Sequence, residues 1–137
     1  MFLRWDHETM VKIPFNPQDF GIVLFVTVTH GNVKRRLKMV LDTGATYCMI
    51  PWHVAEELGY TPALSKTLVE VNTANGQIHT PLITVESMTV LKRTVRRCKV
   101  MVHDLPETSR VDGLIGLSFL RDCDLHIDFV KGVLELK

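Results

Sequence analysis

The sequence predicts an all-β fold, a barrel or a sandwich, and three observations favour it. Short apolar segments with period two or with continuous β-branched content recur along the 137 residues. Turn residues separate these segments at close spacing. Only two segments have a helical pattern, and both are short. Because no linker, internal repeat or low-complexity tract interrupts the chain, we expect residues 1–137 to form a single domain.

The first half of the chain contains a predicted hairpin and a predicted helix. Gly21 to Thr29 (GIVLFVTVT) is typical of a buried strand, and His30-Gly31-Asn32 is typical of a turn. Lys34 to Leu41 then returns as a second strand that runs into Asp42. A short helix is predicted over Pro51 to Gly59, because proline suits a first helical turn and glycine suits the residue just past the end.

The second half contains a further hairpin, more strands and a second helix. Thr67 to Asn72 and Gln77 to Val85 flank Ala74-Asn75-Gly76, and an Asn-Gly pair between alternating runs predicts a tight hairpin in which both residues tolerate positive φ. Ser118 is expected to cap a helix of one or two turns that follows the segment from Val111 to Leu117 (VDGLIGL). The other predicted strands are Met88–Leu91, Thr94–Val102, Leu125–Phe129 and Val133–Leu136.

Composition and charge exclude several classes of function. With 46% hydrophobic residues, 23% charged residues and a net charge of +1, the chain is typical of an ordinary globular protein and lacks a broad positive field, so no nucleic-acid partner is expected. No apolar run approaches the roughly 18 residues that span a bilayer, and the chain does not begin with a signal pattern. The three cysteines are odd in number and widely spaced, which argues against a disulfide scaffold or zinc ribbon. We therefore expect a cytoplasmic protein with no membrane segment.

Two other features have a plain structural interpretation. His53 and Glu57 are four residues apart on the predicted helix, but two ligands do not make a metal site, so no metal is expected.

The basic cluster Lys92 to Lys99 could be an RNA- or phosphate-binding strip or the solvated face of a strand. The second interpretation is favoured because the charges interleave with Val95 and Cys98, and no aromatic residue lies among them to stack on bases.

The segment Met39 to Thr46 (MVLDTGAT) is the strongest functional signal. An apolar strand leads directly into Asp42, and Thr43-Gly44-Ala45 follow as a turn. A carboxylate at a strand end, surrounded by backbone amides and a small hydroxyl, is well placed for acid–base chemistry on water. An Asp-Thr-Gly turn can also be an ordinary connection, so its context matters.

Downstream motifs supply that context. Gly113-Leu114-Ile115-Gly116 precedes the second predicted helix, with Phe119-Leu120 in it, and Ile127-Asp128-Phe129 lies near the end of the chain. Together with the turn after Met39-Val40-Leu41 and with Thr73-Ala74-Asn75-Gly76, this order resembles the retropepsin-like aspartic proteases, the family of the retroviral proteases, and most closely its bacterial single-domain branch. The resemblance implies a closed, retropepsin-like β-barrel that dimerises, with a peptide substrate and no cofactor.

The resemblance also implies roles for particular residues. Asp42 would be the catalytic aspartate, Thr43 would cross-link the two active-site loops through its hydroxyl, and Gly44 would line the floor under the scissile bond. Ala45 matches the alanine of the retroviral enzymes. Thr73, Ala74, Asn75 and Gly76 would form the tip of a flap that closes over the bound peptide, although the glycine-rich retroviral tip is not reproduced.

The chain carries a single Asp-Thr-Gly, whereas aspartic protease chemistry needs two carboxylates that share a proton. Asp112 precedes Gly113 without a hydroxyl residue and is interpreted as a turn residue rather than a second acid. A two-fold homodimer would supply the second Asp42. The predicted function is therefore an aspartic endopeptidase that acts as a homodimer; the alternative is a non-catalytic peptide-binding or dimerisation module of the same fold.

Two further expectations follow from the resemblance. Ala45 offers no side-chain hydrogen bond to the carboxylate, which favours activity at mildly rather than strongly acidic pH. Residues 1–20 match nothing in the family pattern; Phe2 and Trp5 could pack on a partner subunit, on the substrate groove or on neither.

Overall fold

The computed structural model describes residues 11–137. Strands dominate the chain, and the helices are short. In chain order the elements are β1 (Val11–Pro14), β2 (Val23–His30), β3 (Val33–Leu41), β4 (Cys48–Ile50), α1 (Trp52–Glu57), a 3₁₀ turn η1 (Pro62–Leu64), β5 (Leu68–Thr73), β6 (Gly76–Val90), β7 (Arg93–Val102), β8 (Gly113–Ile115), α2 (Leu117–Leu120), β9 (Leu125–Asp128) and β10 (Val133–Leu136).

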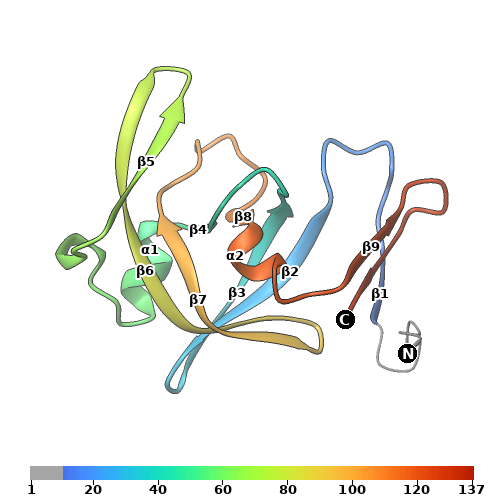
Figure 1. Ribbon diagram of the computed structural model, residues 1–137, viewed down its shortest axis with the longest axis horizontal. Coiled ribbons are helices and arrows are strands. Elements are labelled where there is room, and N and C mark those ends of the chain that lie inside the picture. Colours follow the sequence, from blue (N-terminus) through green and yellow to red (C-terminus); the bar gives the residue numbers. More distant parts are fainter. Residues whose placement is uncertain (1–10) are drawn as a thin grey trace, which may run out of the picture.

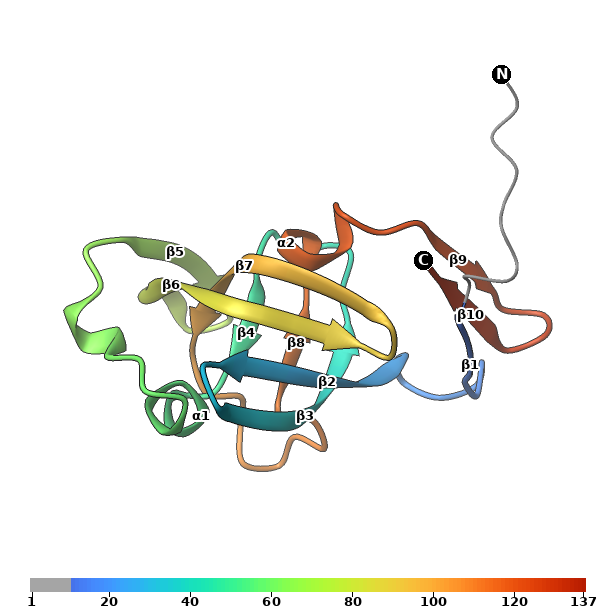
Figure 2. The same cartoon turned by 90° about the horizontal axis from the view of Figure 1, so that it is seen from below.

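Six of the strands form a closed barrel. The larger sheet has the order β2-β3-β8-β4-β7-β6-β5, and an additional antiparallel pairing of β2 with β6 closes its first six strands into a ring. The remaining strand, β5, pairs with the first half of β6, and this hairpin projects from the barrel (Figure 1). Figure 2 shows β2, β3, β6 and β7 side by side on one face of the barrel. The predicted all-β, barrel-like fold is confirmed.

A small second sheet lies beside the barrel. It has the order β1-β10-β9, so the two ends of the described chain pair with each other, Val11 opposite Leu136 and Pro14 opposite Val133. The sequence analysis assigned no element to residues 1–20, so β1 is an addition. Phe2 and Trp5 lie outside the described residues.

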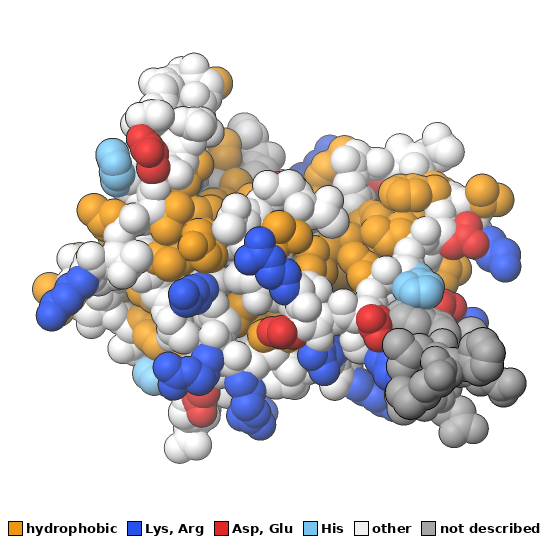
Figure 3. All heavy atoms as spheres, viewed as in Figure 1, with side chains coloured by type: hydrophobic (Ala, Val, Ile, Leu, Met, Phe, Trp, Pro, Cys, Tyr) orange, Lys and Arg blue, Asp and Glu red, His pale blue; other side chains and the backbone are white. Residues whose placement is uncertain are grey.

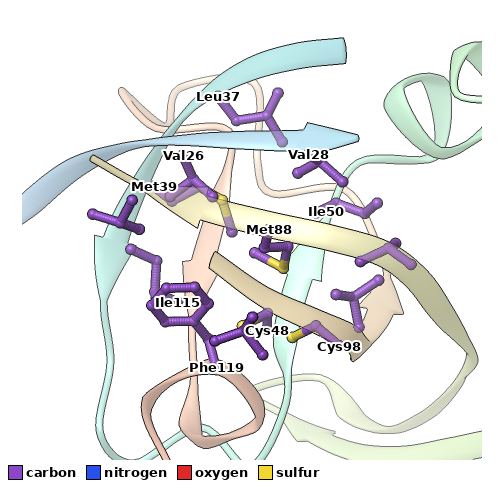
Figure 4. Packing of buried hydrophobic residues seen from close by; sticks show 14 of the residues in the cluster. Val26, Val28, Leu37, Met39, Cys48, Ile50, Met88, Cys98, Ile115 and Phe119 are labelled. Atoms are coloured by element: carbon purple, nitrogen blue, oxygen red, sulfur yellow. The ribbon is translucent and has the colours of Figure 1, made fainter. Parts of the chain in front are cut away.

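The core fills the barrel and extends to the small sheet. Val26, Met39, Ile115 and Phe119 are almost completely buried and come from β2, β3, β8 and α2 (Figure 4). Leu134 of β10 belongs to the same cluster of buried side chains. Burying side chains of this size is the main stabilising contribution to such a fold.

Several predicted elements are confirmed. The first hairpin forms from β2 and β3, with Val28 opposite Arg35. Helix α1 begins after Pro51, and Gly59 follows its end with a φ of 98°, a conformation that suits glycine.

Other predictions about local structure are wrong. Met88–Leu91 is not a separate strand, because β6 continues unbroken from Gly76 to Val90. Ser118 does not cap α2: Gly116 occupies the N-cap position, and the helix has no side-chain cap. The flap hairpin forms as predicted, but only Gly76 of the Asn-Gly pair has a positive φ.

Candidate active site

The turn after β3 presents the Asp42 carboxylate at the edge of the barrel. The backbone N–H of Asp42 donates to the carbonyl of Ile115 at 2.9 Å, so the residue is fixed to the end of β8. Its Oδ1 accepts a hydrogen bond of 3.0 Å from the N–H of Gly44, and the N–H of Ala45 donates to the Asp42 carbonyl at 3.2 Å. Asp42 is partly buried, whereas Thr43 and Gly44 are exposed. One carboxylate oxygen is therefore held while the turn remains open to solvent.

The Gly-Leu-Ile-Gly segment holds this turn in place. The N–H of Leu117 donates to the carbonyl of Ala45 at 2.8 Å, and the N–H of Ser118 donates to the carbonyl of Thr46 at 3.0 Å. A Cβ on Gly116 would lie 2.5 Å from the carbonyl oxygen of Tyr47 and 2.7 Å from that of Ala45. Only glycine allows the two segments to approach so closely. The two motifs that carry the family resemblance are thus directly in contact.

Ser118 connects three elements beneath the turn. Its hydroxyl donates to the carbonyl of Lys99 in β7 at 2.7 Å and accepts from the N–H of Cys48 in β4 at 2.9 Å. Sequence reasoning placed Ser118 at a helix cap and missed this role. The signal that could have indicated it is a lone hydroxyl residue between the apolar Leu117 and Phe119.

We expect Ser118→Ala to destabilise the fold by about 1–3 kcal/mol, because the N–H of Cys48 and the carbonyl of Lys99 lose their hydrogen-bond partner. Urea unfolding measures this difference. The exposed Thr108 is a matched control, since Thr108→Ala also removes a hydroxyl and should change the free energy of unfolding by less than about 0.5 kcal/mol. Equal values for the two variants would show that the Ser118 bridge contributes nothing.

Two buried cysteines lie next to Ser118. Cys48 and Cys98 face each other in the core (Figure 4), and the N–H of Gly116 donates to the sulfur of Cys48 at 3.3 Å. The hydrogen bond from Cys98 lowers the pKa of Cys48 to about 7, against the effect of burial. The same contact and burial raise the pKa of Cys98. Cys48 is therefore the thiol of this pair that loses its proton first.

Asp112 does not meet Asp42. Its Oδ2 accepts a hydrogen bond of 2.8 Å from the N–H of Lys38, and its own N–H donates to the Lys38 carbonyl at 2.7 Å. Because β3 and β8 run parallel, Asp112 precedes one strand while Asp42 follows the other. Three residues of extended strand lie between these positions, so four steps of about 3.3 Å separate them by roughly 13 Å along the strands. Asp112 is thus a structural residue, as the sequence analysis expected, and it cannot be the second acid.

The β5–β6 hairpin, which the sequence analysis interprets as a flap, lies on the same side of the barrel as the turn after β3 (Figure 1). At its tip, the Thr73 hydroxyl donates to the carbonyl of Gly76 at 2.7 Å and accepts from the N–H of Asn75 at 3.3 Å. Ala74 and Asn75 form the two-residue loop between the paired Thr73 and Gly76. The four residues therefore form an ordered tip.

The remaining sequence candidates have structural roles. Glu57 forms an ion pair with Arg35 of β3, so the carboxylate next to His53 already has a partner. In residues 11–137, no three His, Cys, Asp or Glu side chains are grouped as metal ligands are. In the basic cluster, Val95 and Cys98 are buried in the core, as expected for a strand with one solvated face. No helix among the described residues is long and apolar enough to cross a membrane.

Comparisons with known proteins agree with this geometry. A family model described as aspartyl protease matches residues 26–119, and the chain belongs to this family of aspartyl proteases. No curated protein sequence is significantly similar.

Among solved structures, the chain is similar to a retropepsin-like aspartic protease from Rickettsia conorii, with 27% identity over 93% of this chain and 89% of the other and a TM-score of 0.70. It is also similar to the EIAV protease complexed with the inhibitor HBY-793, with 18% identity over 80% of this chain and 93% of the other and a TM-score of 0.59; this second match shows the fold alone. The fold is retropepsin-like, as the motifs implied.

Proposed function

We propose that this chain is an aspartic endopeptidase that acts as a homodimer, with one Asp42 from each copy. The observation that carries the proposal is the open turn after β3, where a carboxylate with one oxygen fixed by Gly44 stands beside a flap hairpin. Membership of the aspartyl protease family supports the chemistry. Asp112 accepts a hydrogen bond from the backbone of β3, which supports a second carboxylate from another copy of the chain rather than from Asp112.

The proposed mechanism uses the two carboxylates in different protonation states. Two carboxyl groups about 3 Å apart cannot both ionise, so the pair holds one proton between them. The ionised Asp42 takes a proton from a water molecule, which attacks the peptide carbonyl carbon, while the protonated Asp42 donates a hydrogen bond to the carbonyl oxygen. The tetrahedral intermediate then collapses, and the leaving amine receives a proton from the pair.

The flap provides the other wall for an extended peptide. Along β5, Val69 and Val71 are partly buried, whereas Glu70 between them is exposed. Ile78 of β6 is opposite Val71 and is also partly buried. One face of the hairpin is therefore apolar. A peptide held between this face and the turn would bind by backbone hydrogen bonds, as in strand addition, with its side chains in apolar surroundings.

Dilution tests the homodimer directly. When the total protein concentration is well below the dimer dissociation constant, the dimer concentration is proportional to the square of the protein concentration. We therefore expect a tenfold dilution to lower the cleavage rate about 100-fold, and the rate per milligram about tenfold. Light scattering or analytical ultracentrifugation on the same samples gives the mass, and a mixed peptide library read by mass spectrometry gives the cleavage. Cleavage at constant rate per milligram by a monomer would exclude a shared carboxylate pair, and a dimer that binds peptides without cleaving them would be the non-catalytic module.

The residue after Gly44 provides a test of the pH dependence. The methyl group of Ala45 cannot donate to the Asp42 carboxylate, so we propose maximal activity at mildly acidic pH. Ala45→Ser adds a hydroxyl donor that stabilises the ionised form, and the acidic limb of the pH–kcat/KM profile should move to lower pH. A wild-type optimum near pH 2, or a shift of the acidic limb to higher pH, would contradict this interpretation.

A further inference from the structure

The net charge of +1 conceals an uneven distribution of charge over the barrel. The strands β3, β2, β6 and β7 lie side by side on one face (Figure 2). They contain eight of the 16 lysines and arginines of the chain but only one of its 15 acidic residues, Glu86. The eight basic residues are Lys34, Arg35, Arg36, Lys38, Arg93, Arg96, Arg97 and Lys99. Figure 3 shows Lys and Arg side chains over the lower half of the barrel, around the β2–β3 hairpin and along β7.

The outward side of this face carries basic side chains at both of its edges. Leu37 and Met39 of β3 are buried in the barrel. Side chains alternate along a strand, so Lys34, Arg36 and Lys38 point outward, and all three are exposed. β7, at the other edge, also has exposed basic residues. Three strand spacings, roughly 14 Å, separate these two basic rows.

Little of this positive charge is neutralised within the chain. Glu86 is engaged at the β2–β3 turn, where its carboxylate accepts a hydrogen bond of 2.5 Å from the N–H of Gly31. Of the eight basic residues, only Arg35 forms an ion pair within residues 11–137, and its partner is Glu57. The face therefore presents a positive surface to a partner, although the chain as a whole is nearly neutral.

Two large apolar side chains are exposed at one end of the same face. Phe25 is 52% exposed and Leu91 is 56% exposed. The pairing of β2 with β6 ends at Thr27 opposite Thr89, and the same register continued by two residues places Phe25 level with Leu91. Lys38 lies directly opposite Phe25 in β3. Apolar and basic side chains are therefore neighbours on this surface.

The backbone at Leu91 is unfavourable for a leucine. Leu91 and Lys92 form the two-residue turn between β6 and β7, and Leu91 has a φ of 52°. Glycine and asparagine are preferred in this left-handed conformation, because a larger side chain is strained there. Since Leu91 is more than half exposed, packing within the chain does little to offset the strain. A strained residue that the fold does not require points to a function at that position.

The chemistry of the face indicates the kind of partner. A single-stranded nucleic acid stacks its bases on open aromatic rings, but one side of the Phe25 ring is covered by the Arg36 guanidinium, 3.9 Å from the ring centroid. A partner that contacts both basic rows has to be broad. A membrane with anionic lipids is broad and negatively charged, and it takes up exposed Phe and Leu side chains beside Lys and Arg at the level of its headgroups.

We propose that this face binds the surface of a membrane that contains anionic lipids. Leu91 and Phe25 insert at the boundary between headgroups and acyl chains, and Arg36, Lys38 and Lys92 contact the negatively charged headgroups. The inference is independent of the proposed function, because none of these residues belongs to the turn after β3 or to the tip of the β5–β6 hairpin.

Co-sedimentation of the 137-residue chain with lipid vesicles tests the proposal. Vesicles of phosphatidylcholine with about one third phosphatidylglycerol should bind the chain at least about tenfold more tightly than vesicles of phosphatidylcholine alone. Raising the salt concentration from about 0.05 M to about 0.5 M should release most of the bound protein, because salt screens the attraction.

Leu91→Gly tests the apolar contact. This variant should bind the anionic vesicles at least about fivefold more weakly, because less apolar surface leaves the water. Its unfolding temperature should be unchanged or higher, since glycine relieves the strain of the positive φ. A loss of binding without a loss of stability is not expected from a merely structural residue. The matched control is Leu64→Gly, at a leucine that is 77% exposed in η1, and it should bind as the wild type does.

A pair of lysine substitutions tests the charges. Lys38→Gln combined with Lys92→Gln should weaken binding about 30-fold, because each lysine near an anionic surface contributes about fivefold. Lys66→Gln combined with Lys131→Gln is the matched control, since both lysines are exposed, lie outside the four strands and change the net charge equally. This control should bind within about threefold of the wild type, because screening limits the reach of distant charges.

Four results would overturn the proposal. The first is equal binding to vesicles with and without phosphatidylglycerol, and the second is unchanged binding of Leu91→Gly. The third is an equal loss in the two lysine pairs, which would assign the attraction to net charge rather than to this face. The fourth is binding of a single-stranded thymidine oligonucleotide by a chain that ignores the anionic vesicles, which would assign the face to nucleic acid. Peptide cleavage enters none of these measurements, so failure of the proposed function would leave them unaffected.

Discussion

The Asp42→Asn variant is expected to cleave peptides at least about 10³-fold more slowly than the wild type, because an amide cannot take a proton from the attacking water. The fold should be unaffected. An asparagine side-chain oxygen accepts the hydrogen bond from the N–H of Gly44 as the carboxylate does, and the residue lies at an open turn. The unfolding temperature should therefore stay within about 2 °C of the wild type. Peptide cleavage at saturating protein concentration and a thermal melt measure the two quantities.

Asp112→Asn is the matched control for this variant. Asp112 is a second aspartate at the start of a motif, directly before Gly113, and its asparagine replacement can still accept from the N–H of Lys38. This control should keep its activity within a factor of about three, since structural substitutions away from a reaction have small effects. If both variants lost activity equally, the loss could not be assigned to the chemistry of Asp42.

Mixing wild-type and Asp42→Asn chains tests whether the two Asp42 carboxylates of a dimer act as a pair. Equal amounts of wild-type and Asp42→Asn chains that exchange freely give about one quarter wild-type dimers, because pairing at a two-fold interface is statistical. The mixture should then show about half the activity of the wild-type portion alone. Undiminished activity would mean that one Asp42 is sufficient.

The sequence predicts the turn after β3 well because the signal is local. Asp42 follows an apolar strand, and the turn chemistry of Thr43-Gly44 marks where that strand ends. The sequence analysis places this turn and Gly116 in two separate motifs and predicts no contact between them. What the sequence does not show is the distance that makes Gly116 necessary, because this depends on carbonyl groups of Ala45 and Tyr47 that face it from another segment.

The division of β6 into two strands was wrong for a physical reason. Buried side chains in a regular strand alternate, but Val85 and Met88 of β6 are both buried at a spacing of three. The neighbouring β7 shows the same spacing between Val95 and Cys98, and Arg97 between them has a φ of 53°. The two strands share a local irregularity that shifts the pattern to the other face. A period-two pattern that changes phase looks like two strands, although β6 and β7 keep the same register on both sides of it.

β1 escaped prediction because its partner is remote. Four residues with a proline at the end carry little strand signal on their own. The strand forms because Ile13 pairs with Leu134, at the other end of the chain. Ser118 was misassigned for a similar reason, since its hydrogen-bond partners lie in β4 and β7 rather than in its own helix.

Gly113→Ala is expected to have the largest effect on stability. Gly113 begins β8, which lies between β3 and β4, and a Cβ there would be 2.0 Å from the carbonyl oxygen of Met49 and 3.1 Å from its carbonyl carbon. Atoms cannot approach so closely, and the obstacle is backbone in a closed barrel rather than a side chain that can rotate away. Overpacking in well-packed cores typically costs about 1–3 kcal/mol and occasionally more. We expect a loss of more than about 3 kcal/mol here, or roughly 10 °C in the unfolding temperature.

A second glycine separates this effect from the general cost of replacing glycine. Gly31 has a φ of 57° in the β2–β3 turn, and a Cβ there would meet no atom within 4 Å. Gly31→Ala should therefore cost only the strain of the left-handed conformation, about 1–2 kcal/mol. Thermal melts of the Gly113→Ala and Gly31→Ala variants compare the two losses of stability, and equal shifts in unfolding temperature would show that the contact with Met49 is relieved.

A displacement of β8 would also affect catalysis, because the carbonyl of Ile115 in this strand accepts a hydrogen bond from the backbone N–H of Asp42. Any Gly113→Ala protein that folds should consequently cleave peptides more slowly than its folded fraction alone predicts.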